Sequence, residues 1–296
     1  MRSIIIVSIA ITLSIVSNSI WACATCLCGD PTITTMGTEK PFAGRKRAGV
    51  EYLSRGEKIG ESGVNELDTD EERTTFNFSY ALNADWMFAA SLPLVTKTVK
   101  RYDMSSERGS GIGDMDLSAR WFVGKDTRFP ARYLWGVQLG LRVPTSSEQQ
   151  SDGVPIDIDA QPGVGATIPS LGLWYGRYAM PWFFYVSAGY QHAITEGYQG
   201  YQAGDVALLT GLAQYALGYG LALQLSLDGR FKQYDKYHDI RDDNSGGVLV
   251  MATPGLAWTP LEDLVINMSY QVPAIENPNG QQEEKPTLRI GVAYDF

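Results

Sequence analysis

The sequence predicts an all-β protein: a transmembrane antiparallel up-and-down β-barrel of about twelve strands, with short turns at one end and longer loops at the other. Three observations predict it: strict alternation of apolar and polar residues, breaks that alternate between short and long, and a last strand that ends on Phe296. Successive side chains of a strand point to opposite faces. In a membrane barrel the apolar face contacts lipid and the polar face lines the lumen.

The composition excludes other classes of protein. The formal net charge of −9 argues against a nucleic-acid partner. Beyond the N-terminus, no run approaches the roughly 20 apolar residues that a membrane-spanning helix needs. Residues 1–22 are predicted to be a signal peptide, with Arg2 before an apolar segment and cleavage expected after Ala22 or after Ala24. Export and a barrel together predict the outer membrane of a Gram-negative bacterium, with both termini in the periplasm.

The barrel is predicted to occupy residues 45–296. Its strands are expected at 47–53, 74–83, 86–95, 114–124, 133–144, 165–175, 182–192, 205–217, 221–232, 248–258, 264–272 and 287–296. A tilted strand crosses a bilayer in roughly 9–11 residues, which most of these segments reach. An even number lets the first and last strands pair and removes both sheet edges.

The breaks between these strands sort by length. Short breaks, expected on the periplasmic side, are 83–85, 125–130, 176–181, 217–220 and 259–263. Long breaks, expected as external loops, are 54–73, 101–110, 145–162, 195–204, 233–245 and 273–285. The acidic residues between Glu57 and Glu72 are therefore expected in a solvated external loop.

Aromatic residues gather near the short breaks, where Trp and Tyr of a barrel form a girdle at the headgroup level. They are Trp86, Trp121, Trp135, Trp174, Tyr175, Tyr178, Trp182 and Trp258. The last strand alternates from Leu288 to Phe296 and resembles the closing strand of outer-membrane barrels. That resemblance implies recognition of Phe296 by the barrel assembly machinery, in addition to contact with outer-membrane lipid.

The opposite parity gives the lumen face, which carries charges of both signs. Its predicted members are Arg47, Glu51, Asp114, Asp116, Arg120, Gln138, Arg142, Asp228, Arg230 and Arg289. These side chains either pair with one another and fill the interior or line a narrow polar passage. A barrel of about twelve strands lies between the roughly eight that side chains can fill and the roughly sixteen that leave an open channel.

Catalytic residues are not expected, and the protein is predicted not to be an enzyme. His192 lies on the apolar-facing parity of its strand, but the residue two positions later is Ile194. The serine of an outer-membrane phospholipase, which would stand there, is therefore missing.

Residues 23–44 precede the first strand and are predicted to lie at the periplasmic mouth or to plug the lumen. Cys23, Cys26 and Cys28 lie close together in this segment. They could bind a soft metal ion, form one disulfide, or anchor a lipid at Cys23. No other cofactor is predicted.

The segment from Gly111 to Trp121 contains Gly-Ile-Gly-Asp, then Leu117, Arg120 and Trp121. It resembles a strand motif of the outer-membrane transporter family of meta-pathway phenol degradation. The resemblance implies a barrel that passes small solutes, including hydrophobic or aromatic compounds. From the residues we expect Gly111, Gly113 and Asp114 to provide a bend and an inward carboxylate.

The predicted function is an outer-membrane channel for passive passage of small solutes, hydrophobic or aromatic ones included. The alternative is a plugged barrel that binds metal or a redox partner through its N-terminal cysteines.

Overall fold

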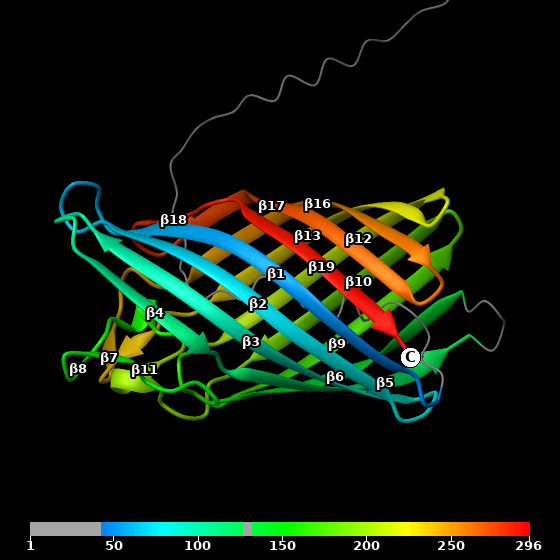
Figure 1. Ribbon diagram of the computed structural model, residues 1–296, viewed down its shortest axis with the longest axis horizontal. Helices are drawn as coiled ribbons and strands as arrows, with labels where there is room; N and C mark the ends of the chain where they lie inside the picture. Colours follow the sequence, from blue (N-terminus) through cyan, green and yellow to red (C-terminus); the bar gives the residue numbers. More distant parts are fainter. Residues whose placement is uncertain (1–42, 127–131) are drawn as a thin grey trace, which may run out of the picture.

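The structure is a computed structural model that describes residues 43–126 and 132–296. It is a closed antiparallel barrel (Figure 1). The sheet has fourteen segments, but β4 and β5 follow each other along β3, and β18 and β19 follow each other along β1, so twelve strands form the wall. The prediction of a twelve-stranded barrel is confirmed. The segments are β1 (Lys46–Ile59), β2 (Leu67–Ala81), β3 (Trp86–Arg101), β4 (Ser106–Ile112), β5 (Met115–Lys125), β6 (Tyr133–Val143), β9 (Ile168–Ala179), β10 (Trp182–Gln191), β12 (Val206–Gly218), β13 (Leu221–Lys232), β16 (Gly247–Leu261), β17 (Leu264–Pro278), β18 (Gln282–Glu284) and β19 (Thr287–Asp295).

The first strand closes the barrel. β1 pairs antiparallel with β2 on one side and with β19 on the other, where Val50 stands opposite Val292. The backbone N–H of Phe296 donates to the carbonyl oxygen of Lys46 at 2.9 Å. The side chains of Arg45 and Arg47 both form ion pairs with Asp295 across the same seam. The pairing therefore removes both edges of the sheet.

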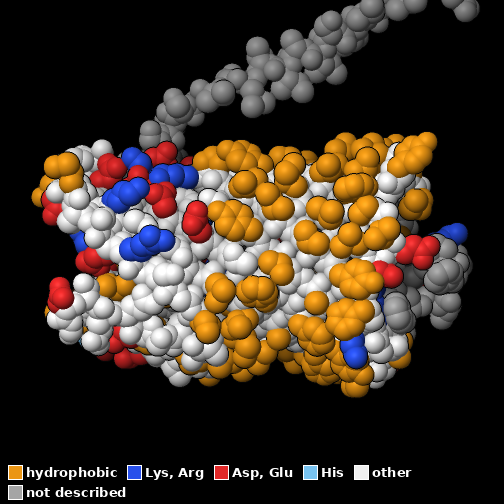
Figure 2. Space-filling view, in the orientation of Figure 1, with side chains coloured by type: hydrophobic (Ala, Val, Ile, Leu, Met, Phe, Trp, Pro, Cys, Tyr) orange, Lys and Arg blue, Asp and Glu red, His pale blue; other side chains and the backbone are white. Residues whose placement is uncertain are grey.

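The outer face of the barrel is apolar because the strands alternate. On β13, the side chains of Leu223, Leu225 and Leu227 are half exposed. The alternating positions Ser226 and Asp228 are buried and face the lumen. Figure 2 shows a broad band of apolar side chains around the barrel, with a large group of charged side chains at one end and a smaller group at the other. An exposed apolar surface of this extent marks contact with lipid.

The two ends of the barrel differ, and we call them the short-turn end and the long-loop end. The short-turn end holds the connections 82–85, 180–181, 219–220 and 262–263, the end of β5, the start of β6 and Phe296 (Figure 1). The long-loop end holds the connections 60–66, 102–105, 144–167, 192–205, 233–246 and 279–281. The sequence correctly predicted that successive connections lie at opposite ends of the barrel. Three of the six expected long loops are nevertheless short.

The acidic stretch between Glu57 and Glu72 was expected in a loop, and this prediction was wrong. β1 continues to Ile59 and β2 begins at Leu67, so only residues 60–66 form the turn. Glu57 and Glu71 point inward and are buried, and Arg55 binds Glu71 with an N–O distance of 2.8 Å. These strands extend past the apolar band, where polar residues occupy both faces, and the alternation that identifies a strand is lost there.

Most of the predicted girdle faces outward near the short-turn end. Trp86 stacks on Trp121 with ring centroids 5.7 Å apart, and Trp182 stacks on Phe184. Trp174 and Tyr178 do not belong to the girdle. Both lie on the inward parity of β9, since their neighbour Tyr175 faces outward.

Three loops cover the long-loop end. Loop 144–167 contains the hairpin β7 (Gln150–Ser151) and β8 (Val154–Pro155) and the 3-10 helix η1 (Ile158–Ala160). Loops 192–205 and 233–246 contain η2 (Tyr198–Gly200) and the small sheet of β11 (Tyr201–Gln202), β14 (Lys236–Tyr237) and β15 (Ile240–Arg241). Within residues 43–126 and 132–296, no helix is long and apolar enough to cross a membrane.

The lipid-facing assignment predicts a depth-dependent cost of charge. Leu225 lies in the middle of the apolar band on β13, whereas the equally outward Leu261 lies beside the short-turn end. Leu225→Arg should lower the free energy of unfolding by about 2–4 kcal/mol, and Leu261→Arg by at most about 1 kcal/mol. Urea unfolding in lipid vesicles measures both. Equal costs at the two positions would contradict the assignment.

Candidate functional site

The candidate site is a cavity in the middle of the lumen, with a volume of about 210 Å³. One side of it is charged and comes from β1, β2, β13 and β19, together with Asp116 of β5 and Arg142 of β6. The other side comes from β9 and β10, with Ser170, Gly172 and Ser187 among its residues. The cavity is therefore amphipathic: one wall offers charges and the other offers little polarity.

Seven of the ten predicted lumen residues line this cavity: Glu51, Asp116, Gln138, Arg142, Asp228, Arg230 and Arg289. The other three, Arg47, Asp114 and Arg120, are buried away from its wall. Arg47 belongs to the closing seam beside Asp295. Five arginines face four carboxylates around the cavity, so their charges nearly balance.

Several of these charges are held by close partners. The guanidinium of Arg142 donates from Nε to Asp116 at 3.0 Å. The carboxylate of Asp228 accepts from the hydroxyls of Thr210 at 3.0 Å and Ser226 at 2.8 Å. Buried charges need such partners, since an isolated ion in the protein interior is costly. The lumen-facing charges named here are therefore held by partners within the wall.

An apolar cluster fills half of the lumen near the short-turn end, and we call it the inner apolar cluster. Its buried members come from β3, β5, β6, β9, β10 and β12. They are Met87, Phe122, Leu134, Trp174, Phe183, Tyr185 and Leu212. Phe122 meets Trp174 edge to face at 4.9 Å between ring centroids. The lumen of this barrel thus has an apolar section, although lumen faces are usually polar.

Arg120 joins the inner apolar cluster to the polar part of the lumen. Its guanidinium lies over the ring of Trp174, 5.2 Å from the centroid, and donates to the side-chain oxygen of Gln138 at 2.7 Å. A guanidinium over an indole face is attracted by the ring quadrupole. Arg120 therefore orients Trp174 at the floor of the cavity, since Trp174 also lines the cavity wall.

Asp114 has a role that the sequence did not indicate. Its carboxylate accepts four hydrogen bonds from loop 144–167: from Ser146 N at 3.2 Å, Ser146 Oγ at 2.5 Å, Val164 N at 2.8 Å and Gly165 N at 3.0 Å. Asp114 thus fastens both ends of the loop to the point where β4 ends and β5 begins. An inward carboxylate was expected at this position, and the structure shows that it accepts hydrogen bonds from loop 144–167.

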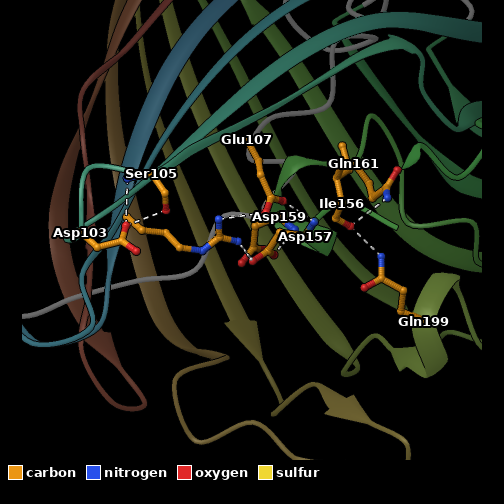
Figure 3. A network of polar contacts seen from close by, with 9 residues as sticks. Asp103, Ser105, Glu107, Ile156, Asp157, Asp159, Gln161 and Gln199 are labelled. Carbon is orange, nitrogen blue, oxygen red and sulfur yellow. Dashed lines mark hydrogen bonds and ion pairs between the residues drawn. The ribbon is translucent and has the colours of Figure 1, made fainter. Parts of the chain in front are cut away.

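Loop 144–167 folds inward over the mouth of the barrel. Ile156 and Ala160 pack against Val99 of β3 in a buried contact. Gln161 is fully buried and bonds to the backbone of Gln149 and Ile156, and Gln199 donates to the carbonyl of Ile156 at 2.8 Å (Figure 3). The loop therefore narrows the lumen at the long-loop end.

Two glycines make room for this loop. A Cβ at Gly109 would lie 2.0 Å from the carbonyl oxygen of Ala160, and a Cβ at Gly113 would lie 2.9 Å from that of Pro162. Both contacts are closer than a carbon can approach an oxygen. Gly109 precedes the Gly-x-Gly-Asp segment; within that segment, Gly113 stands where the loop touches the wall and Asp114 stands where the loop is tied.

The wall is thin beside the cavity. A groove of about 430 Å³ on the lipid-facing side shares Leu117, Ser118, Gly140 and Leu141 with the lining of the cavity. The inward positions here are Ser118 and Gly140, so little more than backbone separates the two spaces. In the sequence, the only sign of this thin wall is the presence of small residues at inward positions.

The inner apolar cluster and the infolded loop were both missed from the sequence. Parity places Phe122 and Tyr185 inward on their strands, and that signal could have predicted aromatic residues in the lumen. No pattern marked Ser146 and Val164 as partners of Asp114.

Residues 1–22, predicted as a signal peptide, and the three cysteines Cys23, Cys26 and Cys28 lie outside the described residues. The metal, disulfide and lipid hypotheses therefore remain predictions. Among residues 43–126 and 132–296, no group of histidine, cysteine, aspartate or glutamate side chains is placed to hold a metal ion.

The fold defines an outer-membrane β-barrel, and solved structures share it. An outer membrane channel from Pseudomonas putida F1 aligns with a TM-score of 0.68 and 12% identity, over 90% of this chain and 100% of that one. The translocator domain of the autotransporter NalP from Neisseria meningitidis aligns with a TM-score of 0.56 and 13% identity, over 90% and 93%. The transport unit of the autotransporter AIDA-I from Escherichia coli gives 0.51 and 9%, over 87% and 92%. These identities show a common fold.

The sequence matches the family described as "Putative MetA-pathway of phenol degradation" over residues 55–290. The chain belongs to this family, as the Gly-x-Gly-Asp motif predicted. Among curated proteins, none matches the sequence.

The anchoring role of Asp114 predicts a selective change in loop 144–167. Asp114→Ala should free the loop and raise the hydrogen–deuterium exchange of its amides, because four hydrogen bonds are lost. Asp116→Ala is the matched control, since Asp116 lies two residues away and pairs with Arg142 instead. Unchanged exchange in the Asp114→Ala loop, or equal exchange in both variants, would show that Asp114 does not hold it.

Proposed function

We propose that this protein is an outer-membrane channel for the passive passage of small solutes, and that hydrophobic or aromatic compounds are its preferred class. The observation that carries this proposal is the inner apolar cluster. It lies on the path from the cavity to the short-turn end, and Trp174 and Tyr185 belong both to the cluster and to the cavity wall.

The cluster favours an apolar solute over an ion. A hydrated ion that passes an apolar section gives up water contacts that the wall does not replace. An aromatic ring gains there, because its apolar surface leaves water and stacks on the side chains. The facing half of the lumen has small buried side chains at this end, including Ala222, Ala257 and Ala293.

The amphipathic cavity suits a ring with one small polar group. Gln138, Arg142 and Asp116 can bond to a hydroxyl, while the glycine and serine positions of β9 and β10 accept the ring face. Charges of nearly balanced sign hold neither anions nor cations strongly. The family description and the fold support passage of this kind.

We place the long-loop end outside the cell and the short-turn end in the periplasm. Barrels of this fold have short periplasmic turns and longer external loops. Phe296 would then lie on the periplasmic side, where we expect the barrel assembly machinery to bind it.

Planar-bilayer recordings test the proposal with phenol and glycerol, two small uncharged solutes. We expect small unitary current steps that phenol reduces, because phenol occupies the lumen, whereas glycerol at equal concentration leaves them unchanged. Equal effects of the two solutes would contradict the preference. Steps that appear only after deletion of residues 23–44 would favour the plugged barrel.

The role of the cluster is tested by Trp174→Ala in the same recordings. Removing the indole should increase the unitary current and weaken the effect of phenol, because the apolar section widens and loses its largest ring. Trp135→Ala is the matched control, since Trp135 lies on the neighbouring strand and faces lipid. If both variants behave like the native protein, the cluster does not select the solute.

A further inference from the structure

A second cavity lies among the loops at the long-loop end, and we call it the loop cavity. Its volume is about 490 Å³, and it shares no lining residue with the lumen cavity. It lies between η1, the turn from β1 to β2, and the small sheet of β11, β14 and β15. Four aspartates and two tyrosines are prominent in its lining: Asp157, Asp159, Asp235, Asp242, Tyr201 and Tyr237.

Two of the four aspartates have cationic partners. Asp157 accepts from Arg101 at 2.8 Å, and the same guanidinium binds Glu107 (Figure 3). Asp235 accepts from Lys232 at 2.6 Å and also from the backbone N–H of Gly204. Their charges are therefore compensated within the protein.

The other two carboxylates have no ion-pair partner among the described residues. Asp242 accepts only the backbone N–H of Asn244, at 2.9 Å. The carboxylate of Asp159 accepts no hydrogen bond from the described part of the chain, although Asp159 lies beside Asp157 in η1 (Figure 3). The one arginine of the lining, Arg241, is bound to Asp243 at 2.7 Å. The loop cavity thus holds two carboxylates that form no direct ion pair with a described residue.

The environment of Asp159 resists its negative charge. Burial, followed by the neighbouring carboxylate of Asp157, raises the pKa of Asp159 to about 6. Burial also raises the pKa of Asp242. A cation that entered the cavity would relieve both carboxylates.

The remaining lining is aromatic and aliphatic. The rings of Tyr201 and Tyr237 lie 5.3 Å apart, and Ile59, Leu67 and Ile158 complete the wall. A metal ion would require several oxygen ligands around one point, and the described residues offer no such group. An organic ammonium ion fits this lining better, because its charge meets carboxylates and ring faces while its carbon part meets apolar side chains.

We propose that the loop cavity is a binding site for a small organic ammonium ion that carries an apolar group, with Asp159 and Asp242 as its counter-ions. Tyr237 contributes a ring face to the ligand, and the buried ring of Tyr201 packs against Tyr237. The site is separate from the lumen cavity, so it can bind whether or not the barrel conducts.

The test is calorimetric titration of the purified full-length protein in detergent with 2-phenylethylammonium. 2-Phenylethanol and phenylacetate are the comparators, since they carry the same ring with no charge or the opposite charge. We expect saturable binding of the ammonium ion and much weaker binding of the other two. Equal binding of 2-phenylethanol, or displacement of the ammonium by micromolar calcium ions, would overturn the proposal.

Variants locate the site. Asp159→Asn should weaken binding by about tenfold, since one charge-assisted interaction is lost, and Asp242→Asn should weaken it as well. Asp103→Asn is the matched control, because Asp103 lies in the exposed turn 102–105 at the same end and its carboxylate bonds to Ser105. Heat-dependent migration on gels verifies that each variant folds. If Asp159→Asn does not fold, Asp242→Asn is used in its place.

A result that points to the lumen would also overturn the proposal. Binding that Trp174→Ala abolishes and Asp159→Asn leaves intact would place the ligand in the lumen cavity. Failure of the phenol recordings, in contrast, concerns the channel alone.

Titration with pH gives an independent readout. Three neighbouring carboxylates raise the pKa of Asp159: those of Asp157, Asp235 and Asp242. The ammonium group of Lys97 lowers this pKa. Below about pH 6 Asp159 is protonated and neutral, whereas an alkylammonium stays charged. Binding should therefore be weaker at pH 5 than at pH 7.5, and stronger binding at pH 5 would contradict a role for Asp159.

Discussion

The closing of β1 against β19 is the constraint on which the rest of this structure depends. Inside hydrocarbon, a backbone N–H or carbonyl without a partner costs several kcal/mol. β1 has a neighbour on each side, so the sheet has no free edge in the apolar band. Closure fixes an even number of strands and brings both ends of the barrel chain together. Alternation along each strand then divides the side chains between lipid and lumen.

The closed wall encloses a divided interior. At the long-loop end, loop 144–167 turns inward and is tied by Asp114. At the short-turn end, the inner apolar cluster fills half of the lumen. Between them lies a cavity with a charged wall and a weakly polar wall. The lumen of a porin is polar and filled with water, so the apolar section is the physical basis for proposing a channel for small apolar solutes.

The sequence predicted the strands wherever one face meets lipid, because lipid selects apolar residues at every second position. It failed where the strands extend beyond the apolar band. Glu57 and Glu71 belong to such extensions, and their polar neighbours gave the appearance of a loop. Trp174 was misplaced for a related reason: composition suggested a girdle, but parity against Tyr175 places it in the lumen. The bonds of Asp114 join residues far apart in the chain, so no local pattern could reveal them.

Closure can be tested directly by hydrogen–deuterium exchange of the full-length protein in lipid vesicles. If β1 and β19 pair as described, their amides between Val50 and Leu53 and between Leu288 and Val292 exchange as slowly as those of β12 and β13. Exchange of these amides as fast as that of loop 233–246 would mean an open seam, and the account of a closed, lipid-embedded barrel would be wrong.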